Sequence, residues 1–420
     1  MGKRIFVATA GSRGDVEPFL ALSKALQSAG YDVLLSAPPD FGAWIASHGI
    51  AHHASGDPAR GIVDAFADAI ENDQFFRALA RSDYEQKFRA LFESVAEASR
   101  GADLIIYSPL MTSTAFLAEA RRIPAIAVYL APAFPTQDFA VPVQRRYSYG
   151  RLLNPLSHRA LDLLLWNMFR PWWNSVRNGM PGLKPLGRFH DIHTMNGKPV
   201  PHLFAVSETL VPRPRDWPDY AVMTGNFFLD GGENWQVPAD LGAFLEAGPA
   251  PIYIGFGSMP LGQSKTKAAV LAEALRLSGQ RAVVARGWGG WGEAFTSSLG
   301  ASVHVIDAAP HRRLFPLMAG VVHHGGAGTT AAGLLAGRPA LVTPLMLDQY
   351  FFANLVARHG AGPRPLPVKK WRADLLAERL VELTRVTGYA CRAQELAARM
   401  SQENGPGRAL EVVRAIAGPP

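Results

Sequence analysis

Short apolar runs alternate with amphipathic runs along the first third of the chain. Residues 5–10 are apolar and end at a Gly-Ser-Arg-Gly-Asp turn, after which apolar residues recur at helical spacing from Val16 to Ala29. The first pattern predicts a buried strand and the second an amphipathic helix. Similar patterns predict strands at residues 32–36, 103–107, 123–130 and 203–207, and a helix at 112–122. This alternation predicts a parallel sheet covered on both faces.

A second series of the same kind begins at Pro251. Strands are predicted at 251–258, 281–285, 302–306, 321–323 and 340–343. The span before them, from Leu229 to Pro251, has no periodicity and is rich in Gly and Pro, which is typical of a linker. We therefore expect an α/β protein with two doubly wound, Rossmann-like domains facing a cleft, at 1–230 and 251–395, joined by a linker at 231–250. A helix over 396–416, within the terminal segment 396–420, could return to the first domain.

The rhythm breaks between residues 131 and 201, a stretch rich in Pro, Trp and Arg. Apolar residues at helical spacing predict a helix at 156–170 within it. Three interpretations are open. The helix packs on its own domain, or it lines the apolar entrance of an acceptor site, or it lies at a membrane interface. The third is less favoured because basic residues are sparse for that role.

Composition narrows the class of protein. The chain has 420 residues, of which 48% are hydrophobic and 18% charged, as in an ordinary folded protein. The net charge of +7 suits an anionic ligand or a membrane surface, although a solvated basic face is the commoner cause, and no nucleic-acid motif is present. Cys391 is the only cysteine, which excludes an intrachain disulfide and a Cys-based zinc site. Without a signal-like start or a run of ~18 apolar residues, we expect a cytoplasmic protein.

The segment 320–333 is the strongest candidate for a ligand site. It begins as an apolar strand, passes through His323-His324 into a glycine turn, and continues as a small-residue helix. Glycines allow close approach to a ligand, and the free N–H groups of a helix start attract anions. The next strand is followed by Asp348-Gln349. Because ligands bind at the carboxyl ends of parallel strands, phosphate at one end and an Asp-Gln pair at the next suggest a sugar diphosphate.

Two further glycine turns follow the first strand of each predicted domain, at 11–15 and 255–258. Neither completes G-x-G-x-x-G or a P-loop, so a Rossmann dehydrogenase and a P-loop kinase fit poorly. Asp15 has two interpretations, a helix N-cap or a proton acceptor. The helix dipole and Arg13 favour its ionised form, which predicts a weak base.

Five motifs in order carry a family resemblance. They are Gly11-Ser-Arg-Gly-Asp-Val-Glu-Pro-Phe19, Ser36-Ala-Pro-Pro-Asp40, Ala309-Pro-His311 with Leu314-Phe-Pro316, His323-His-Gly-Gly-Ala-Gly-Thr-Thr330 and Asp348-Gln349. Together they resemble the bacterial glycosyltransferases that decorate glycopeptide and macrolide antibiotics, and the related sterol 3-β-glucosyltransferases. The resemblance implies a GT-B fold, with the acceptor in the first domain and the nucleotide sugar in the second.

The resemblance also implies residue roles. Asp15 matches a proposed general base, while Ser12, Arg13 and Gly14 match positions facing the diphosphate. The donor side is implied to comprise the following residues: Ser258, His323, Gly325, Gly326, Ala327, Gly328 and Thr329 near the diphosphate, and Asp348 and Gln349 at the sugar hydroxyls.

Two family features are missing. The plant-type base-stacking Trp is absent beside Pro310 and His311, whose backbone can still meet the base edge. Trp288 is one candidate for the missing ring, a core or loop position being the alternative. The plant-type His–Asp dyad is also absent, since its partner position falls near Ser108. His324 is interpreted as a packing residue, and His52-His53 as a solvated loop pair.

These features predict an inverting transfer of a hexose from a UDP- or dTDP-sugar to a hydroxyl of an apolar acceptor, such as a sterol, polyketide or aromatic aglycone. The expected acceptor residues are Phe134, Trp166, Phe169, Trp172 and Trp173. No metal motif or cofactor is expected, nor nucleic-acid binding, and membrane contact is expected to be weak at most. Two alternatives remain: a nucleotide-sugar 2-epimerase, which should have more acidic residues in the cleft and lack the apolar insertion, and a non-catalytic binding protein for an apolar small molecule.

Overall fold

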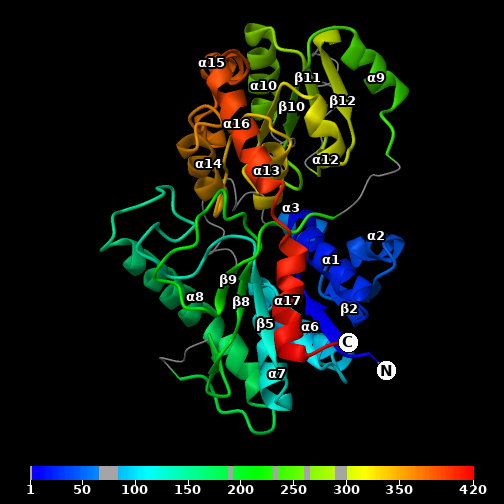
Figure 1. Cartoon of the computed structure of the whole chain (residues 1–420), viewed down its shortest axis with the longest axis vertical. Helices are drawn as coiled ribbons and strands as arrows, with labels where there is room; N and C mark the ends of the chain where they lie inside the picture. The colour runs from blue at the N-terminus through cyan, green and yellow to red at the C-terminus, as the bar shows by residue number, and fades with distance from the viewer. Residues whose placement is uncertain (1, 66–83, 188–192, 230–234, 260–264, 289–299) are drawn as a thin grey trace.

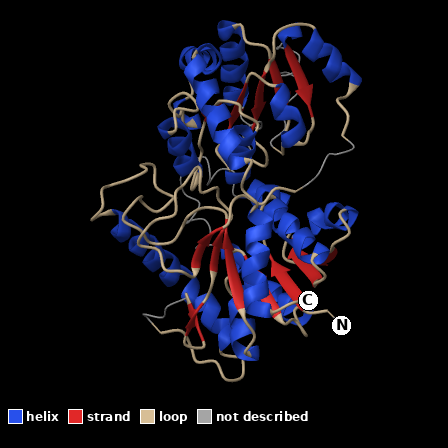
Figure 2. Ribbon diagram, viewed as in Figure 1, coloured by secondary structure: helices blue, strands red, loops and turns tan. Residues whose placement is uncertain are grey.

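The computed structural model describes residues 2–65, 84–187, 193–229, 235–259, 265–288 and 300–420. Two parallel sheets lie in separate lobes, with helices around each (Figures 1 and 2). This confirms the predicted pair of doubly wound α/β domains. The first sheet has the order β3-β2-β1-β4-β5-β8-β9 and the second the order β12-β11-β10-β13-β14.

The strands of the first sheet are short, and all but the edge strand β3 are largely buried. They comprise β1 (Arg4–Ala8), β2 (Asp32–Ala37), β3 (Ala51–Ala54), β4 (Leu104–Tyr107), β5 (Ala125–Tyr129), β8 (His202–Phe204) and β9 (Ala221–Met223). Along β1, Ile5 and Val7 pack into one core cluster, whereas Phe6 and Ala8 pack into another on the opposite face. This two-sided burial explains why the sequence runs apolar without alternation. The helices of this lobe are α1 (Arg13–Ser28), α2 (Gly42–Ser47), α3 (Ala59–Ala65), α6 (Tyr84–Ala98), α7 (Thr114–Arg121) and α8 (Asn154–Arg177).

The second sheet is built in the same way. It comprises β10 (Ile252–Gly255), β11 (Ala282–Ala285), β12 (Val303–Ile306), β13 (Gly320–His323) and β14 (Ala340–Val342). Ile252 and Ile254 face one core cluster, and Tyr253 between them faces another. The helices around it are α9 (Ala239–Glu246), α10 (Lys265–Ser278), α12 (His311–Leu314), α13 (Ala327–Leu335), α14 (Gln349–Arg358), α15 (Ala373–Arg385) and α16 (Thr387–Met400). A two-stranded antiparallel hairpin, β6 (Thr194–Met195) and β7 (Lys198–Pro199), lies apart from both sheets.

The end of the chain crosses from the second lobe to the first (Figure 1). The sequence predicted one helix over 396–416, but the structure has two, α16 and α17 (Gly405–Ala417). The break has a local cause, because the Asn404 side chain accepts a hydrogen bond from Gly407 N at 3.0 Å and caps α17. Ala409 and Val413 of α17 then join the core cluster that contains α1.

Two segments predicted as irregular are ordered. Within the expected linker, α9 packs on the second domain, since Leu241 is buried in its core and the Phe244 ring stacks on His304 at 5.4 Å. The pair His52-His53 forms β3 rather than a solvated loop. His52 Nε2 lies 3.1 Å from Ala37 O, and His53 contacts Ser36 and Ser94.

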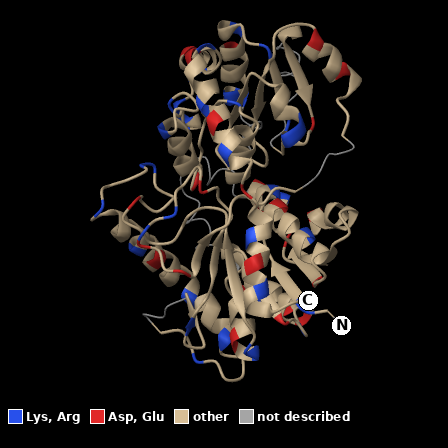
Figure 3. Ribbon diagram, in the orientation of Figure 1, with Lys and Arg blue, Asp and Glu red and all other residues tan. Residues whose placement is uncertain are grey.

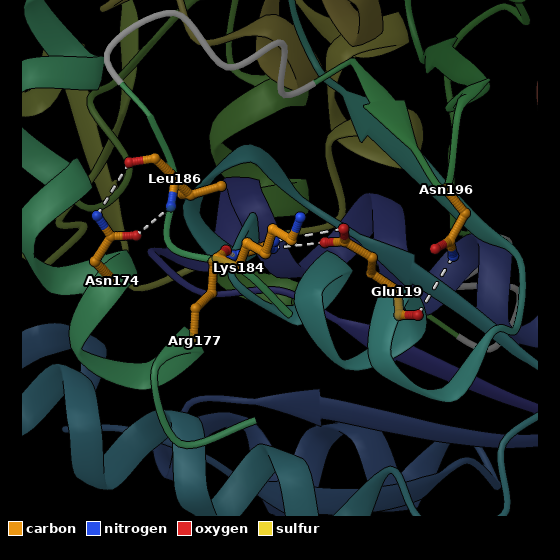
Figure 4. A network of polar contacts seen from close by, with 6 residues as sticks. All are labelled: Glu119, Asn174, Arg177, Lys184, Leu186 and Asn196. Atoms are coloured by element: carbon orange, nitrogen blue, oxygen red, sulfur yellow. Dashed lines mark hydrogen bonds and ion pairs between the residues drawn. The ribbon is translucent and has the colours of Figure 1, made fainter. Parts of the chain in front are cut away.

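The insertion between β5 and β8 is attached to the first domain through α8. Figure 4 shows the Arg177 guanidinium, almost fully buried, against the Glu119 carboxylate of α7, with Nη1 and Oε2 2.5 Å apart. Arg177 Nε also donates to Lys184 O at 3.1 Å. The side chain of Asn174 donates to Leu186 O and accepts from Leu186 N, which holds the loop after the helix. A buried guanidinium loses water, and these partners replace it.

The two domains contact each other where helices follow strand ends. Helix α1, after β1, contacts helix α13, after β13. On one side of this contact, Phe41 stacks on Trp288 with ring centroids 6.2 Å apart. On the other, Tyr147 of the insertion stacks on Phe351 of α14 at 5.3 Å. The carboxyl ends of β1 and β13 therefore face the same region between the lobes.

Candidate donor and catalytic site

The start of α13 is an open helix N-terminus. Gly325 precedes it with φ +99°, and an added Cβ there would lie 2.8 Å from both Gln349 O and Val342 Cγ1, so only glycine fits. Gly326 is the N-cap and offers no side-chain cap, and the first turn holds no acidic residue. Within the described residues, no hydrogen bond satisfies the N–H groups of Ala327, Gly328 and Thr329. The positive end of the helix is thus available to an anion.

His323 lies at the last position of β13 and is fully buried. Its Nδ1 accepts a hydrogen bond from Gly325 N at 3.0 Å, which places the ring proton on Nε2. Burial lowers the pKa of His323 well below its usual value, so the ring is neutral. Nε2 has no partner among the described residues. An unpaired buried N–H carries a free-energy cost, and a phosphate oxygen would remove it.

His324 packs beside this turn. A Cβ added to Gly326 would lie 2.7 Å from its Nε2, and one added to Gly257 would lie 3.6 Å from its Cε1. Burial lowers the pKa of His324 to about 4, so it carries no charge near neutral pH. Its ring lies between the two glycine turns of the second domain, and Ser258, half-buried, follows one of them.

Asp15 lies in the first turn of α1. The N-cap is Ser12 rather than Asp15, whose carboxylate Oδ2 accepts hydrogen bonds from Ser12 N at 2.8 Å and Ser12 Oγ at 3.0 Å. Gly11, with φ +109°, leaves the space, because an added Cβ would lie 2.5 Å from that oxygen. The predicted low pKa is wrong in sign. Burial raises the pKa of Asp15 and outweighs both hydrogen bonds from Ser12, which makes it a stronger base than expected.

Arg13 does not neutralise Asp15. Its guanidinium forms an ion pair with Glu17, with Nε and Oε2 3.1 Å apart, and lies over the Trp44 ring at 4.6 Å. Its side chain is exposed, as is Gly14 beside it.

Asp348 and Gln349 have separate surroundings. Leu347 has φ +48°, and Asp348 follows as the N-cap of α14. The pKa of Asp348 is raised to about 7, first by burial and then by the negative charge of Asp15 from the other domain. Gln349 is buried, and its Oε1 accepts from Leu345 N at 2.8 Å and from Met346 N at 3.2 Å. Gln349 therefore braces the turn that presents Asp348.

The residues expected near the nucleobase of the donor take defined positions. Pro310 is the N-cap of the short helix α12. The ring of His311 stacks on Phe315 with centroids 4.4 Å apart. Burial, then the Arg13 charge, lowers the pKa of His311 to about 4. The ring of Trp288 stacks on Phe41 of the first domain instead of standing free beside Pro310.

The expected acceptor residues separate into two groups. Trp166 and Trp173 are buried in the core of the first domain, and their centroids lie 5.6 Å apart. Both indoles pack within this core, and their contact with an acceptor stays a prediction. Phe169 and Trp172 are half-buried at the edge of the same cluster, Trp172 near Phe88. Phe134 lies in a separate aromatic cluster with its rings in contact with His193, His202, Phe204, Trp217 and Tyr220.

Among the described residues, no three His, Cys, Asp or Glu side chains gather in a way that could hold a metal ion. No helix in the described part of the chain is both long and apolar enough to cross a bilayer.

The comparisons with known proteins agree with this geometry. The model of the glycosyltransferase family 28 N-terminal domain matches residues 5–139, and that of the erythromycin biosynthesis protein CIII-like C-terminal domain matches residues 292–417. Sterol 3-β-glucosyltransferase UGT80B1 of Arabidopsis thaliana is 31% identical over 97% of this chain and 67% of its own length. The chain belongs to the glycosyltransferase family that contains this sterol 3-β-glucosyltransferase.

Further relatives and solved structures are similar to this chain. Sterol 3-β-glucosyltransferase UGT80A2 of Arabidopsis thaliana is 32% identical over 97% of this chain, which spans 64% of that relative. The chain spans only 29% of a relative of the same name from Neosartorya fischeri, at 33% identity. A solved structure of the glycotransferase of kitacinnamycin matches with a TM-score of 0.72 at 20% identity, covering 100% of both chains. The glycosyltransferase VinC, solved in complex with dTDP, matches with a TM-score of 0.67 at 17% identity over 99% of both chains. These likenesses show the GT-B fold.

Three features of the candidate site escaped sequence reasoning. The S-x-x-D spacing from Ser12 to Asp15 is a capping signal that could have been found. The bracing role of Gln349 has no local signature. The electrostatic contact between Asp15 and Asp348 joins residues 333 positions apart, and only the folded arrangement of two domains shows it.

Proposed function

We propose that the chain catalyses an inverting transfer of a hexose from a UDP- or dTDP-sugar to a hydroxyl group of an apolar acceptor, with sterols and natural-product aglycones as the acceptor class. The observation that carries the donor half is the unpaired Nε2–H of His323 beside the uncapped start of α13. Together they offer one side-chain donor and a turn of backbone donors to a single anion.

The diphosphate is the group that fits these donors. As the glycosidic bond to the donor breaks, negative charge develops on the leaving diphosphate, and N–H groups already in place stabilise it without rearrangement. His323 suits this role while neutral, because a neutral imidazole with its proton on Nε2 donates regardless of pH near 7. Thr329 and the backbone from Gly326 to Gly328 complete the proposed diphosphate contacts, with Ser258 on the neighbouring turn.

Asp15 is proposed as the base for the acceptor hydroxyl. Its carboxylate comes from the opposite domain, and Ser12 fixes its orientation through two hydrogen bonds. The acceptor oxygen attacks the anomeric carbon from the side opposite the diphosphate, its proton passes to Asp15, and the carbon–phosphate oxygen bond breaks. Attack on that side inverts the anomeric configuration. Asp348, near Asp15, is proposed to contact the sugar hydroxyls.

Neither alternative is favoured by the comparisons. Sterol glucosyltransferase relatives align over nearly the whole chain, including the insertion that an epimerase would lack. A binding protein would have no need of a buried carboxylate whose pKa is raised beside an anion site.

The test is a transfer assay with UDP-glucose and dTDP-glucose, each offered a sterol and an aromatic aglycone in detergent. Mass spectrometry should detect a product heavier by one hexose, and NMR should show a β-linkage formed from the α-linked donor. An α-linked product would overturn inversion. Tight nucleotide binding with neither transfer nor donor hydrolysis would favour the binding-protein alternative.

A further inference from the structure

The outward side of α8 is apolar and uncovered. Leu156, Ala160, Leu163 and Leu164 recur at three- and four-residue intervals and share one face of the helix. The three leucines are 52–53% exposed, and Leu152 and Leu153 before the helix are 87% and 54% exposed. Of the eleven large hydrophobic side chains that are exposed in the described part of the chain, six lie between Tyr149 and Leu164.

This face is unusual because the opposite side of α8 is also apolar. Trp166, Trp173 and Val176 are buried against the first domain. A helix that is apolar on both sides is normally covered on both sides. Contiguous exposed apolar surface on this scale marks a binding surface rather than scattered surface leucines.

Positive charge surrounds the same face. The insertion at 131–201 carries nine Lys and Arg against three Asp, and so accounts for six of the seven net positive charges of the chain. Arg146, Arg151 and Arg159 are exposed on α8 and the loop before it, while Arg145 lies over the Tyr350 ring of the second domain. Figure 3 shows basic residues along this loop, at the outer edge of the first lobe. The sequence argument treated basic residues here as sparse, but their share of the net charge is large.

We propose that the face formed by Leu152, Leu153, Leu156, Leu163 and Leu164 docks on the surface of an anionic lipid bilayer. The leucines enter the boundary between head groups and acyl chains, while the neighbouring arginines reach the lipid phosphates. Since no described helix can cross a bilayer, α8 lies along the surface. This inference rests on the proposed function, because an apolar acceptor such as a sterol partitions into lipid and would be taken from there.

Charge decides between a bilayer and a second copy of the chain. A two-fold dimer through α8 would bring the same arginines of both copies together, which costs free energy. An anionic bilayer instead offers these arginines the opposite charge. Attraction of this kind weakens with salt.

The experiment is vesicle co-sedimentation of the full chain. The probes are phosphatidylcholine vesicles and vesicles that also contain about 30% phosphatidylglycerol, at low and high salt. The wild type should bind the anionic vesicles, and raised salt should weaken this binding. The triple variant Leu156→Gln/Leu163→Gln/Leu164→Gln should bind about tenfold less, since three side chains lose their apolar contact.

A matched control changes two leucines elsewhere. Leu277 and Leu317 are 49% and 39% exposed on the second domain, so Leu277→Gln/Leu317→Gln should bind vesicles as the wild type does. A second variant, Arg151→Gln/Arg159→Gln, should lose mainly the salt-sensitive part of the binding. Thermal unfolding of each variant shows that the fold is retained.

Three outcomes would overturn the proposal. They are absence of wild-type binding to anionic vesicles, equal binding by the leucine variant, and a concentration-dependent dimer that only the leucine variant loses. Failure of the proposed function looks different. Hydrolysis of UDP-glucose and transfer to a detergent-dispersed acceptor need no bilayer, so their absence in every variant would refute glycosyl transfer whatever the vesicles show.

Discussion

Helices α1 and α13 contact each other across the two domains, and their N-termini differ in whether the chain places a carboxylate there. In α1 the chain supplies its own anion, because the Asp15 carboxylate accepts two hydrogen bonds from Ser12. In α13 the N-cap is Gly326, no acidic residue follows in the first turn, and within the described residues the first N–H groups have no partner. One helix start has a carboxylate of the chain beside it, while the other has none and can accept an anion from outside.

Under the proposed function, the two helix starts take different roles in the transfer reaction. A fixed carboxylate repels a diphosphate but accepts a proton, so the start of α1 suits the acceptor hydroxyl. An open helix end with a neutral histidine beside it holds a diphosphate but accepts no proton from the acceptor. Because the two ends are neighbours, the sugar between them would meet both groups at once. The following changes test this division, beginning with the largest expected effect.

Replacing the fixed anion should stop transfer but spare donor binding. We expect Asp15→Asn to lower kcat by about 10²–10⁴-fold, the usual contribution of a general base. The affinity for UDP, measured by titration calorimetry, should stay within about threefold because the diphosphate donors lie on α13. Asparagine can still accept from Ser12, so the helix start should survive. Retained turnover would reduce Asp15 to a capping residue of α1.

Removing the side-chain donor on the other side should have the opposite signature. In His323→Ala the Nε2–H is lost, and the Kd for UDP should rise about 10–100-fold, as for a hydrogen bond to a charged group. His323→Gln retains an N–H donor and should recover part of the affinity. An unchanged Kd in both variants would show that this nitrogen does not contact the diphosphate.

The start of α13 was easier to predict from the sequence than the surroundings of Asp15 at the start of α1. The turn before α13 was predictable because strand, glycines and small-residue helix are contiguous, and each has a local physical signature. The sign of the Asp15 pKa shift was not predictable, since burial depends on the tertiary packing around the side chain. The sequence argument counted the helix dipole and Arg13, but Arg13 pairs with Glu17 instead.

The rest of the fold repeats this lesson. Most buried strands and the helices α1, α7 and α8 were predicted, whereas the amphipathic helices α6, α10 and α15 were passed over. The edge strand β3 is partly exposed and contains two histidines, so it lacks an apolar run, and α9 lies in a span rich in Gly and Pro. The break before α17 did have a signal, Asn404 followed by Gly-Pro-Gly, which sequence reasoning passed over. Trp166 and Trp173 show what composition leaves open, because the same aromatic helix pattern suits the lining of an acceptor site and the core of a domain. Only tertiary packing separates the two.

The backbone of the open helix start offers a matched pair of changes. Gly325→Ala puts a Cβ within 2.8 Å of Gln349 O at a φ of +99°, so it should destabilise the fold by about 1–3 kcal/mol and weaken UDP binding. Gly328→Ala meets nothing within 4 Å and should change stability by at most about 1 kcal/mol, in the favourable direction, since alanine is the better helix former. Thermal unfolding and UDP titration of both variants check this. Similar losses in the two variants would mean that the turn is not the rigid element we describe.

The smallest expected effect concerns the pH at which the fixed anion becomes available. Asp15 accepts a proton only when it is ionised, so kcat should rise with pH as Asp15 ionises. Burial raises the pKa of Asp15 and so moves this rise to higher pH. The charge of Asp15 adds to burial in raising the pKa of Asp348 to about 7, so Asp348 is still largely protonated while Asp15 loses its proton. Asp348→Asn therefore replaces one neutral side chain by another over this pH range. The rise of kcat should stay within a fraction of a unit of its wild-type position.

The pH dependence of stability gives an independent test of the raised pKa of Asp348 through the same variant, Asp348→Asn. The folded-state pKa of Asp348 is raised from 3.8 to about 7, so its favourable contribution to stability is complete below 3.8 and is lost as pH rises to about 7. Asp348→Asn has no such proton to lose. Its Tm relative to the wild type should therefore be higher above pH ~7 than at pH ~4. As a control, Asp374→Asn removes an exposed carboxylate paired with Arg372, and should leave the kcat profile in place. If the Tm of Asp348→Asn relative to the wild type were the same at pH ~4 and above pH ~7, Asp348 would not titrate as a buried group beside Asp15, and the two helix starts would not share one site.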